Sequence, residues 1–177
     1  MPRLFFALQP TPAQSTALVE SIAPLVADLA GQPVPAANLH ATLCFIGAVD
    51  EEKLPDMKAA ASSVRGHAVA LDFESLEFWE KPGILCATAA ENILARDLSS
   101  AISDAVLAAG FTPDVKPFRA HLTLARKVLR RTAEKFEWPR ALASVRVRCE
   151  QFVLMQSRRD DAGSTYSVVE SWPLYEK

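Results

Sequence analysis

HATLCFI at residues 40–46 and HLTLAR at residues 121–126 are two short, mostly apolar segments that begin with histidine and carry threonine two positions later. Apolar runs of this length are typical of buried β-strands. Side chains at positions i and i+2 of a strand lie on the same face. Each predicted strand therefore places an imidazole beside a hydroxyl: His40 beside Thr42, and His121 beside Thr123.

A strand and then a helix precede each of these two segments. Leu4 in the first predicted strand lies 36 positions before His40, and Ile84 in its counterpart lies 37 positions before His121. This spacing indicates a duplicated strand–helix–strand unit, in which each half contributes one equivalent strand to a shared cleft. The predicted elements are a strand at 3–8 with a helix at 11–31, and a strand at 84–89 with a helix at 91–109.

The first of these helices has recognisable ends. Thr11, Pro12 and Gln14 match an N-cap, a proline at the first helical position and the far member of a capping box. Gly31 matches a C-terminal cap. Pro24 lies inside the pattern, so we expect it to kink the helix or to split it.

The remaining segments predict further strands and one more helix. An apolar periodicity follows Asp50 and predicts a helix. Alternating and apolar runs, separated by a polar segment at 132–139, predict the other strands. These are a strand at 69–73, a separate strand at 76–79, a stretch at 145–154 with a break, and a strand at 165–169.

The size and composition of the chain favour a single domain over residues 1–177. Its 177 residues are 50% hydrophobic, which suffices for one buried core. The cysteines at 44, 86 and 149 are too widely spaced for a zinc site and odd in number, so we expect reduced, buried thiols. The N-terminal apolar run is too short for a signal sequence, and no stretch is long enough to span a membrane. We therefore expect a cytoplasmic protein.

The net charge argues against a protein that binds long nucleic acids. It is -2, with a pI near 5.9, whereas binding by counterion release usually needs a basic surface. Residues 115–131 nevertheless carry six basic side chains and no acidic one. This basic segment is either an anion-attracting mouth or an ordinary solvated edge. Its basic residues are Lys116, Arg119, Arg126, Lys127, Arg130 and Arg131.

The paired histidines suit in-line displacement at phosphorus. The entering and leaving oxygens of that reaction lie on opposite sides of the phosphorus atom, so a base is needed at one end and an acid at the other. The hydroxyls of Thr42 and Thr123, with a cation such as Arg126 or Lys127, would hold the other phosphate oxygens. In a regular strand Arg126 points away from the face of His121, so its part depends on a bend.

Other interpretations of the histidines are weaker. One motif alone would more often be a histidine satisfied within a sheet, but the pair occupies equivalent places in two halves. The third histidine, His67, has valine at +2 and is given no role. A metal site is disfavoured because neither His-x-His nor His-Glu-x-x-His spacing occurs. A non-enzymatic nucleotide-binding module and a protein-interaction module are the remaining alternatives, and turnover of a cyclic nucleotide would exclude both.

The two motifs make the chain resemble the 2H phosphoesterase superfamily, and within it the RNA 2′,3′-cyclic phosphodiesterases, also called the 2′-5′ RNA ligase family. The resemblance covers most of the chain: RLFFA at 3–7, NLHATLCFIG at 38–47, FRAHLTLAR at 118–126, and the segment from Ser157-Arg158 through Tyr166 to Leu174. One departure is Ala120, where relatives often have proline.

The resemblance implies a bilobal, pseudo-symmetric α+β fold, with antiparallel sheets lining a central cleft and helices packed outside. It implies that His40 protonates the leaving 3′ oxygen, that His121 activates water, and that a 2′-phosphate results. Thr42, Thr123 and Arg126 would bind the phosphate. It also implies the reverse reaction, 2′-5′ ligation of RNA ends.

The expected ligands follow from these roles. RNA ends or small cyclic nucleotides would be the substrates, with no metal, cofactor, membrane or obligate protein partner, and the protein would be a monomer. Trp79 and Phe118 could stack on a base, although packing in the core is an equally good interpretation for each.

Overall fold

The computed structural model describes residues 3–114, 116–160 and 163–176. Val115, where the predicted basic segment begins, lies outside these residues. The described elements are β1 (Arg3–Leu8), α1 (Pro12–Asp28), β2 (Gln32–Pro33), η1 (Ala36–Asn38), β3 (Ala41–Ala48), η2 (Glu51–Lys53), α2 (Leu54–Ser63), β4 (Val69–Trp79), β5 (Ile84–Ala89), α3 (Ile93–Ala108), β6 (His121–Arg126), α4 (Arg130–Ala133), β7 (Arg140–Cys149), β8 (Gln151–Asp160) and β9 (Gly163–Pro173).

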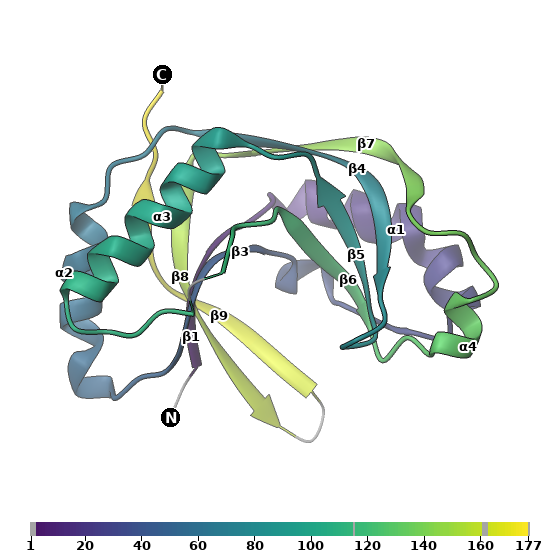
Figure 1. Cartoon of the computed structure of the whole chain (residues 1–177), viewed down its shortest axis with the longest axis horizontal. Coiled ribbons are helices and arrows are strands. Elements are labelled where there is room, and N and C mark those ends of the chain that lie inside the picture. The colour runs from purple at the N-terminus through teal and green to yellow at the C-terminus, as the bar shows by residue number, and fades with distance from the viewer. Residues whose placement is uncertain (1–2, 115, 161–162, 177) are drawn as a thin grey trace.

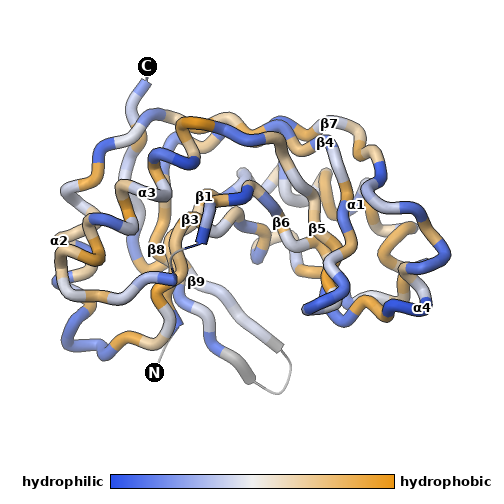
Figure 2. Tube along the Cα trace, viewed as in Figure 1, coloured by the Kyte–Doolittle hydropathy of each residue, from blue (hydrophilic) through white to orange (hydrophobic). Residues whose placement is uncertain are grey.

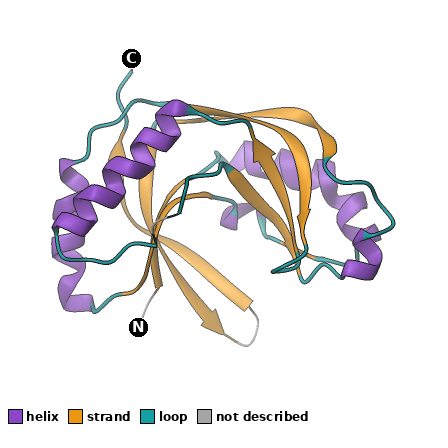
Figure 3. Cartoon of the chain, viewed as in Figure 1, coloured by secondary structure: helices purple, strands orange, loops and turns teal. Residues whose placement is uncertain are grey.

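These strands form two antiparallel sheets. The first sheet has the order β3-β1-β8-β9, and the second has the order β2-β6-β5-β4-β7. Apart from the short β2, the orders correspond: β1 lies between the histidine strand β3 and the long β8, and β5 lies between the histidine strand β6 and the long β4. Helices cover the outer sides of both sheets (Figure 3). The predicted bilobal, pseudo-symmetric α+β fold is thus confirmed.

Each long helix packs on the lobe opposite to the strand that precedes it (Figure 1). Helix α1 follows β1 of the first sheet, yet the side-chain amide of Gln14 donates to the carbonyl of Arg146 on β7, at 2.9 Å. Helix α3 follows β5 of the second sheet, yet the hydroxyl of Ser99 donates to the carbonyl of Leu43 on β3, at 2.6 Å. The lobes are therefore interleaved. This supports one domain over 1–177, which stays a prediction.

The helices bury one side each. Hydrophobic and hydrophilic residues alternate along α2 and α3 (Figure 2), as expected for helices with one face against a sheet. On α3 the buried apolar residues are Ala95, Leu98, Ile102 and Val106, at helical spacing. They join a hydrophobic core that extends through both lobes and includes Phe6 of β1 and Leu85 of β5. The cysteines at 44, 86 and 149 are buried and free, as predicted.

Strand β4 corrects one prediction. The expected strands at 69–73 and 76–79 are a single strand, with a bulge between Phe73 and Ser75 in its pairing with both neighbours. The buried positions change from odd to even numbers at this bulge, from Phe73 to Leu76. Because a bulge adds one residue without ending the strand, the hydrophobic pattern changes phase and resembles two strands.

Helix α1 differs from two further predictions. The capping box of Thr11 and Gln14 is present, but Pro24 lies inside one continuous helix. Its ring faces the exposed side, where water can satisfy the carbonyl that loses its partner. The left-handed residue at the end is Ala30 (φ 52°), not Gly31. Gly31 serves packing instead, because a Cβ there would lie 2.9 Å from Cγ2 of Val128.

The C-terminal strands are longer than predicted. The expected break within 145–154 falls at Glu150, between β7 and β8, and these strands extend to residues 140 and 160. Strand β9 spans Gly163–Pro173 rather than 165–169. Its pairing with β8 brings Tyr166 opposite Ser157. This hairpin places side chains near the first histidine motif.

Candidate active site

The two histidines have the same backbone surroundings. His40 directly precedes β3 and His121 begins β6. Nδ1 of His40 lies 2.7 Å from the carbonyl oxygen of Asn38, and Nδ1 of His121 lies 2.8 Å from that of Arg119. Because a carbonyl oxygen only accepts, each Nδ1 carries a hydrogen and donates it. In both rings Nε2 is therefore the atom that can take up or release a proton.

A bulge in each histidine strand changes which side chains share the histidine face. In β6, Ala125 and Thr123 pair with consecutive residues of β5, so Leu124 is the extra residue. Leu124 and Ala125 are then both buried, and Arg126 returns to the exposed side. This is the bend on which the part of Arg126 depends: the bulge places Arg126 on the face of Thr123.

Strand β3 has the matching bulge at Leu43, between the pairs Phe6–Cys44 and Ala7–Thr42. Leu43 and Cys44 are both buried, and the half-buried Phe45 follows on the face of Thr42. Phe45 and Arg126 thus occupy equivalent places, each five residues after its histidine. The pseudo-symmetry extends to the bulges but not to the chemistry, because one half supplies a ring and the other a cation.

A pocket of about 370 Å³ lies on the His40 side. It brings together His40, Thr42 and Arg126 of the predicted site residues. Two further arginines, Arg3 and Arg158, line it, and among the described residues no carboxylate does. His121 and Thr123 are not part of the wall of this pocket, but they lie on the same face of β6 as Arg126, which is. Three guanidinium groups in one pocket suit a phosphate ligand.

Aromatic rings flank both imidazoles. The ring centroid of His40 lies 4.8 Å from that of Phe5 and 5.1 Å from that of Tyr166. Nη2 of Arg126 donates to the hydroxyl of Tyr166 at 3.3 Å. The centroid of His121 lies 4.7 Å from that of Trp79. Trp79 was among the candidate residues predicted from the sequence. Tyr166 was not, because its place near His40 depends on the β8–β9 hairpin.

Glu77 organises the surroundings of His121. Its carboxylate accepts hydrogen bonds from Nε1 of Trp79 at 2.9 Å, from the hydroxyl of Thr88 at 3.1 Å, and from Nη2 of Arg119 at 2.6 and 2.7 Å. The guanidinium of Arg119 also lies over the Trp79 ring, 5.2 Å from its centroid. One carboxylate therefore fixes the ring beside His121. Sequence spacing gave no sign of this network.

The carboxylate of Glu77 stays charged. Burial alone would raise its pKa, but the hydrogen bonds from Trp79 and Thr88 and the positive charge of Arg119 hold the pKa below its usual range. The side chain of Arg119 is half exposed, so this ion pair adds little to stability. Its consequence is geometric, because it holds the Trp79 ring against His121.

Both histidines are neutral in the free site at pH 7. Burial lowers the pKa of His40 to about 4, against the hydrogen bond to Asn38, and the charges of Arg126 and His121 lower it further. Burial also lowers the pKa of His121, against the hydrogen bond to the carbonyl of Arg119; the charge of the Arg119 guanidinium lowers it further, and Glu77 raises it. The charges of His121 and Arg126 therefore both act on His40.

The other singled-out residues lie elsewhere. His67 forms an isolated bridge with Tyr175. Phe118 lines a second cavity, and Lys127 adopts a left-handed backbone (φ 53°) just after β6. Within residues 3–114, 116–160 and 163–176, no three His, Cys, Asp or Glu side chains are grouped so as to hold a metal ion. Over the same part of the chain, no helix is long and apolar enough to cross a membrane.

Comparison with known proteins gives one family and several relatives. The sequence model of the family described as LigT like Phosphoesterase matches residues 7–86 and 90–166. An RNA 2′,3′-cyclic phosphodiesterase of Thermus thermophilus is 30% identical, over 97% of this chain and 90% of the relative. One of Archaeoglobus fulgidus is 32% identical, over 60% of this chain and 64% of the relative, which is less than two thirds of its length.

Solved structures show the same fold. The apo form of Escherichia coli LigT aligns with a TM-score of 0.84 at 24% identity, covering 99% of both chains. LigT complexed with 3′-AMP aligns with a TM-score of 0.81 at 24% identity, covering 98% of this chain and 99% of the other. At these identities the likeness concerns the arrangement of the elements.

Proposed function

The chain belongs to the LigT-like phosphoesterase family, and on that premise we propose that it is an RNA 2′,3′-cyclic phosphodiesterase with His40 and His121 as its acid–base pair. The observation that carries the proposal is the equivalent presentation of the two Nε2 atoms from β3 and β6, beside a pocket lined by arginines. The names of the curated relatives support the substrate, as does the binding of 3′-AMP by LigT.

The proposed reaction is an in-line displacement by water. Nε2 of His121 takes a proton as the water oxygen attacks phosphorus. The bond from phosphorus to the 3′ oxygen breaks, and Nε2 of His40 gives its proton to that oxygen, which leaves a 2′-phosphate. The hydroxyls of Thr42 and Thr123 and the guanidinium of Arg126 would bind the oxygens that gain negative charge.

The same groups would serve the reverse type of transfer. If the 5′-hydroxyl of a second RNA replaces water, His121 takes the proton of that hydroxyl. The bond from phosphorus to the 3′ oxygen breaks as before, and a 2′-5′ linkage forms.

Turnover of a 2′,3′-cyclic mononucleotide by the purified protein tests the hydrolytic function itself, and an unchanged substrate under all conditions would contradict it.

The value of kcat/KM is expected to be highest below pH 6.5. The acid must be protonated while the base is neutral, yet the pKa of both histidines is lowered, that of His40 to about 4. Both limbs of a bell-shaped kcat/KM profile should therefore lie below pH 6.5, with a fall of about tenfold per pH unit above the upper limb. The anionic substrate raises the pKa of both rings, so the kcat profile should lie at higher pH.

Initial rates between pH 4 and 9 measure both profiles. A kcat/KM maximum at pH 7.5 or above would contradict the assigned protonation states. The variant His67→Ala is a suitable control, because His67 lies outside the described site and should leave the profile unchanged.

Excess EDTA is expected to leave the rate of hydrolysis within about twofold of its value without chelator. The acid, the base and the groups that bind the phosphate oxygens are all side chains of this protein, so no step is assigned to a metal ion. The rate on a 2′,3′-cyclic mononucleotide with and without EDTA measures this. Loss of activity that a divalent ion restores would refute the mechanism.

A further inference from the structure

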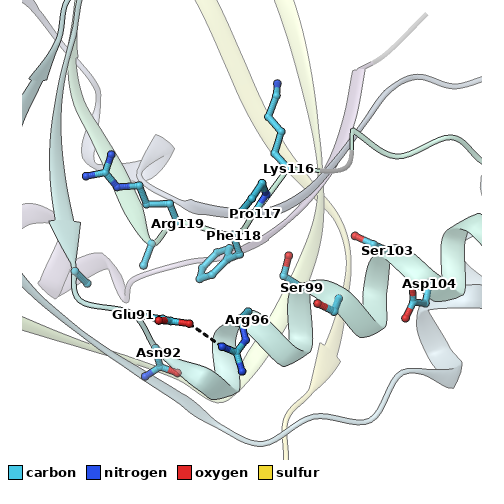
Figure 4. Close-up of a pocket in the computed structure, with 13 residues that line it drawn as sticks. Glu91, Asn92, Arg96, Ser99, Ser103, Asp104, Lys116, Pro117, Phe118 and Arg119 are labelled. Atoms are coloured by element: carbon cyan, nitrogen blue, oxygen red, sulfur yellow. Dashed lines mark hydrogen bonds and ion pairs between the residues drawn. The ribbon is translucent and has the colours of Figure 1, made fainter.

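A second cavity, of about 890 Å³, lies between α3 and the segment that leads into β6. Phe118 and Lys116 come from that segment, and Arg96 and Ser100 come from α3. In Figure 4 the ring of Phe118 extends from its segment toward the ion pair between Glu91, which precedes α3, and Arg96 on α3. The cavity is more than twice the volume of the pocket beside His40.

The wall of this cavity combines a flat ring with positive charge. Phe118 is half-buried, so one part of its ring packs against the core while another lines the cavity. Arg96 supplies a guanidinium group from α3, and Glu91 and Asp104 also line the cavity. Lys116 and Arg119 belong to the wall, but their side chains extend away from α3 in Figure 4. Each of the three cations has a carboxylate partner, for example Glu91 at 2.7 Å from Arg96. Aromatic rings beside cations are what single-stranded RNA sites use to stack a base and hold a phosphate.

Arg119 connects the cavity to the proposed reaction site. Arg119 is a residue of the cavity wall, and its guanidinium lies over the Trp79 ring, 5.2 Å from the centroid. Its carbonyl accepts the hydrogen bond from Nδ1 of His121 at 2.8 Å, and the Trp79 centroid lies 4.7 Å from that of His121. Arg119 is therefore the one residue between a ligand in the cavity and the proposed base, His121, with its flanking ring, Trp79.

The chemistry of the substrate says which part of it could reach this cavity. A 2′,3′-cyclic phosphate is the last group of an RNA chain, so the chain continues only on the 5′ side of the terminal nucleoside. On the proposed function, that nucleoside would lie beside the rings that flank the two histidines. We propose that the cavity between α3 and residues 116–120 binds the nucleotide that precedes the cyclic end. This rests on the proposed function and defines its substrate as an RNA chain.

The test compares two substrates on each of four proteins. The substrates are a 2′,3′-cyclic mononucleotide and a four-nucleotide RNA with the same terminal base and a 2′,3′-cyclic phosphate. The proteins are the wild type, Arg96→Ala, Ser100→Phe and Arg148→Ala. Ser100→Phe places a bulky side chain at the exposed rim of the cavity, on the helix surface.

Arg148→Ala is the matched control. The side chain of Arg148 is 47% exposed and that of Arg96 is 48% exposed, and each pairs with two carboxylates. Arg148 lies on β7, outside the cavity wall. A general effect of losing a surface arginine would therefore appear in both variants.

The wild type should prefer the RNA by about tenfold in kcat/KM, the usual worth of one stacked base or charged hydrogen bond. Arg96→Ala and Ser100→Phe should remove most of this preference, mainly through KM, and leave mononucleotide turnover within about twofold. Arg148→Ala should keep the preference. Equal turnover of both substrates by the wild type, or a preference that survives both cavity variants, would overturn the inference. Failure to hydrolyse either substrate would instead overturn the proposed function.

Discussion

Replacing His40 or His121 with alanine is expected to lower kcat for hydrolysis of a 2′,3′-cyclic phosphate by roughly 10²- to 10⁴-fold, the usual worth of a positioned proton-transfer group. Each ring presents Nε2 because its Nδ1 is committed to a backbone carbonyl, at 2.7 Å in one case and 2.8 Å in the other. The two groups act on the same displacement, so the double variant should be little slower than the slower single variant. Single-turnover rates of the three proteins measure this.

The control for these variants is His67→Ala, which should keep wild-type kcat. His67 bridges to Tyr175 and takes no part in the proposed site. Thermal unfolding of each variant separates loss of chemistry from loss of fold, because the ring of His40 packs against Phe5 and Tyr166. A His67 variant as damaged as the other two, or a His121 variant with normal kcat, would show that the histidines have been given the wrong roles.

The product is expected to carry its phosphate almost entirely on the 2′ oxygen. The two motifs are alike, so histidines alone could protonate either ribose oxygen. The surroundings are not alike: Arg3, Arg126 and Arg158 line the pocket beside His40, whereas Trp79, held by Glu77, flanks His121. This asymmetry should hold the substrate in one orientation. The family resemblance implies that the 3′ oxygen would lie beside His40.

Hydrolysis of a 2′,3′-cyclic mononucleotide, followed by phosphorus NMR or chromatography of the monophosphates, measures the ratio of products. A dominant 3′-phosphate would show that His121 is the acid and His40 the base, the reverse of the proposed roles. Equal amounts would mean that the arginine pocket does not orient the substrate. Arg158→Ala provides a graded check, because removing one cation from the pocket should lower the excess of the 2′ product rather than reverse it.

The sequence by itself determined the features that depend on neighbouring residues. The capping box of Thr11 and Gln14 starts α1 where it was predicted, because its hydrogen bonds join residues three positions apart. The repeated strand–helix–strand order followed from hydrophobic periodicity, and the resemblance carried by the two motifs implied the α+β class. The sharing of one strand face by His40 and Thr42, and by His121 and Thr123, needed only the alternation of side chains. The roles of these four residues stay predictions.

Only the tertiary structure decided which distant residues meet. The bulge at Leu124 returns Arg126 to the cleft face, and an unbulged strand would have turned it away. Tyr166 reaches His40 through the β8–β9 hairpin, and Glu77 fixes Trp79 beside His121. Helices α1 and α3 each cover the opposite lobe. Burial of apolar surface is non-directional, so an amphipathic pattern shows that a helix face is buried but not against which sheet.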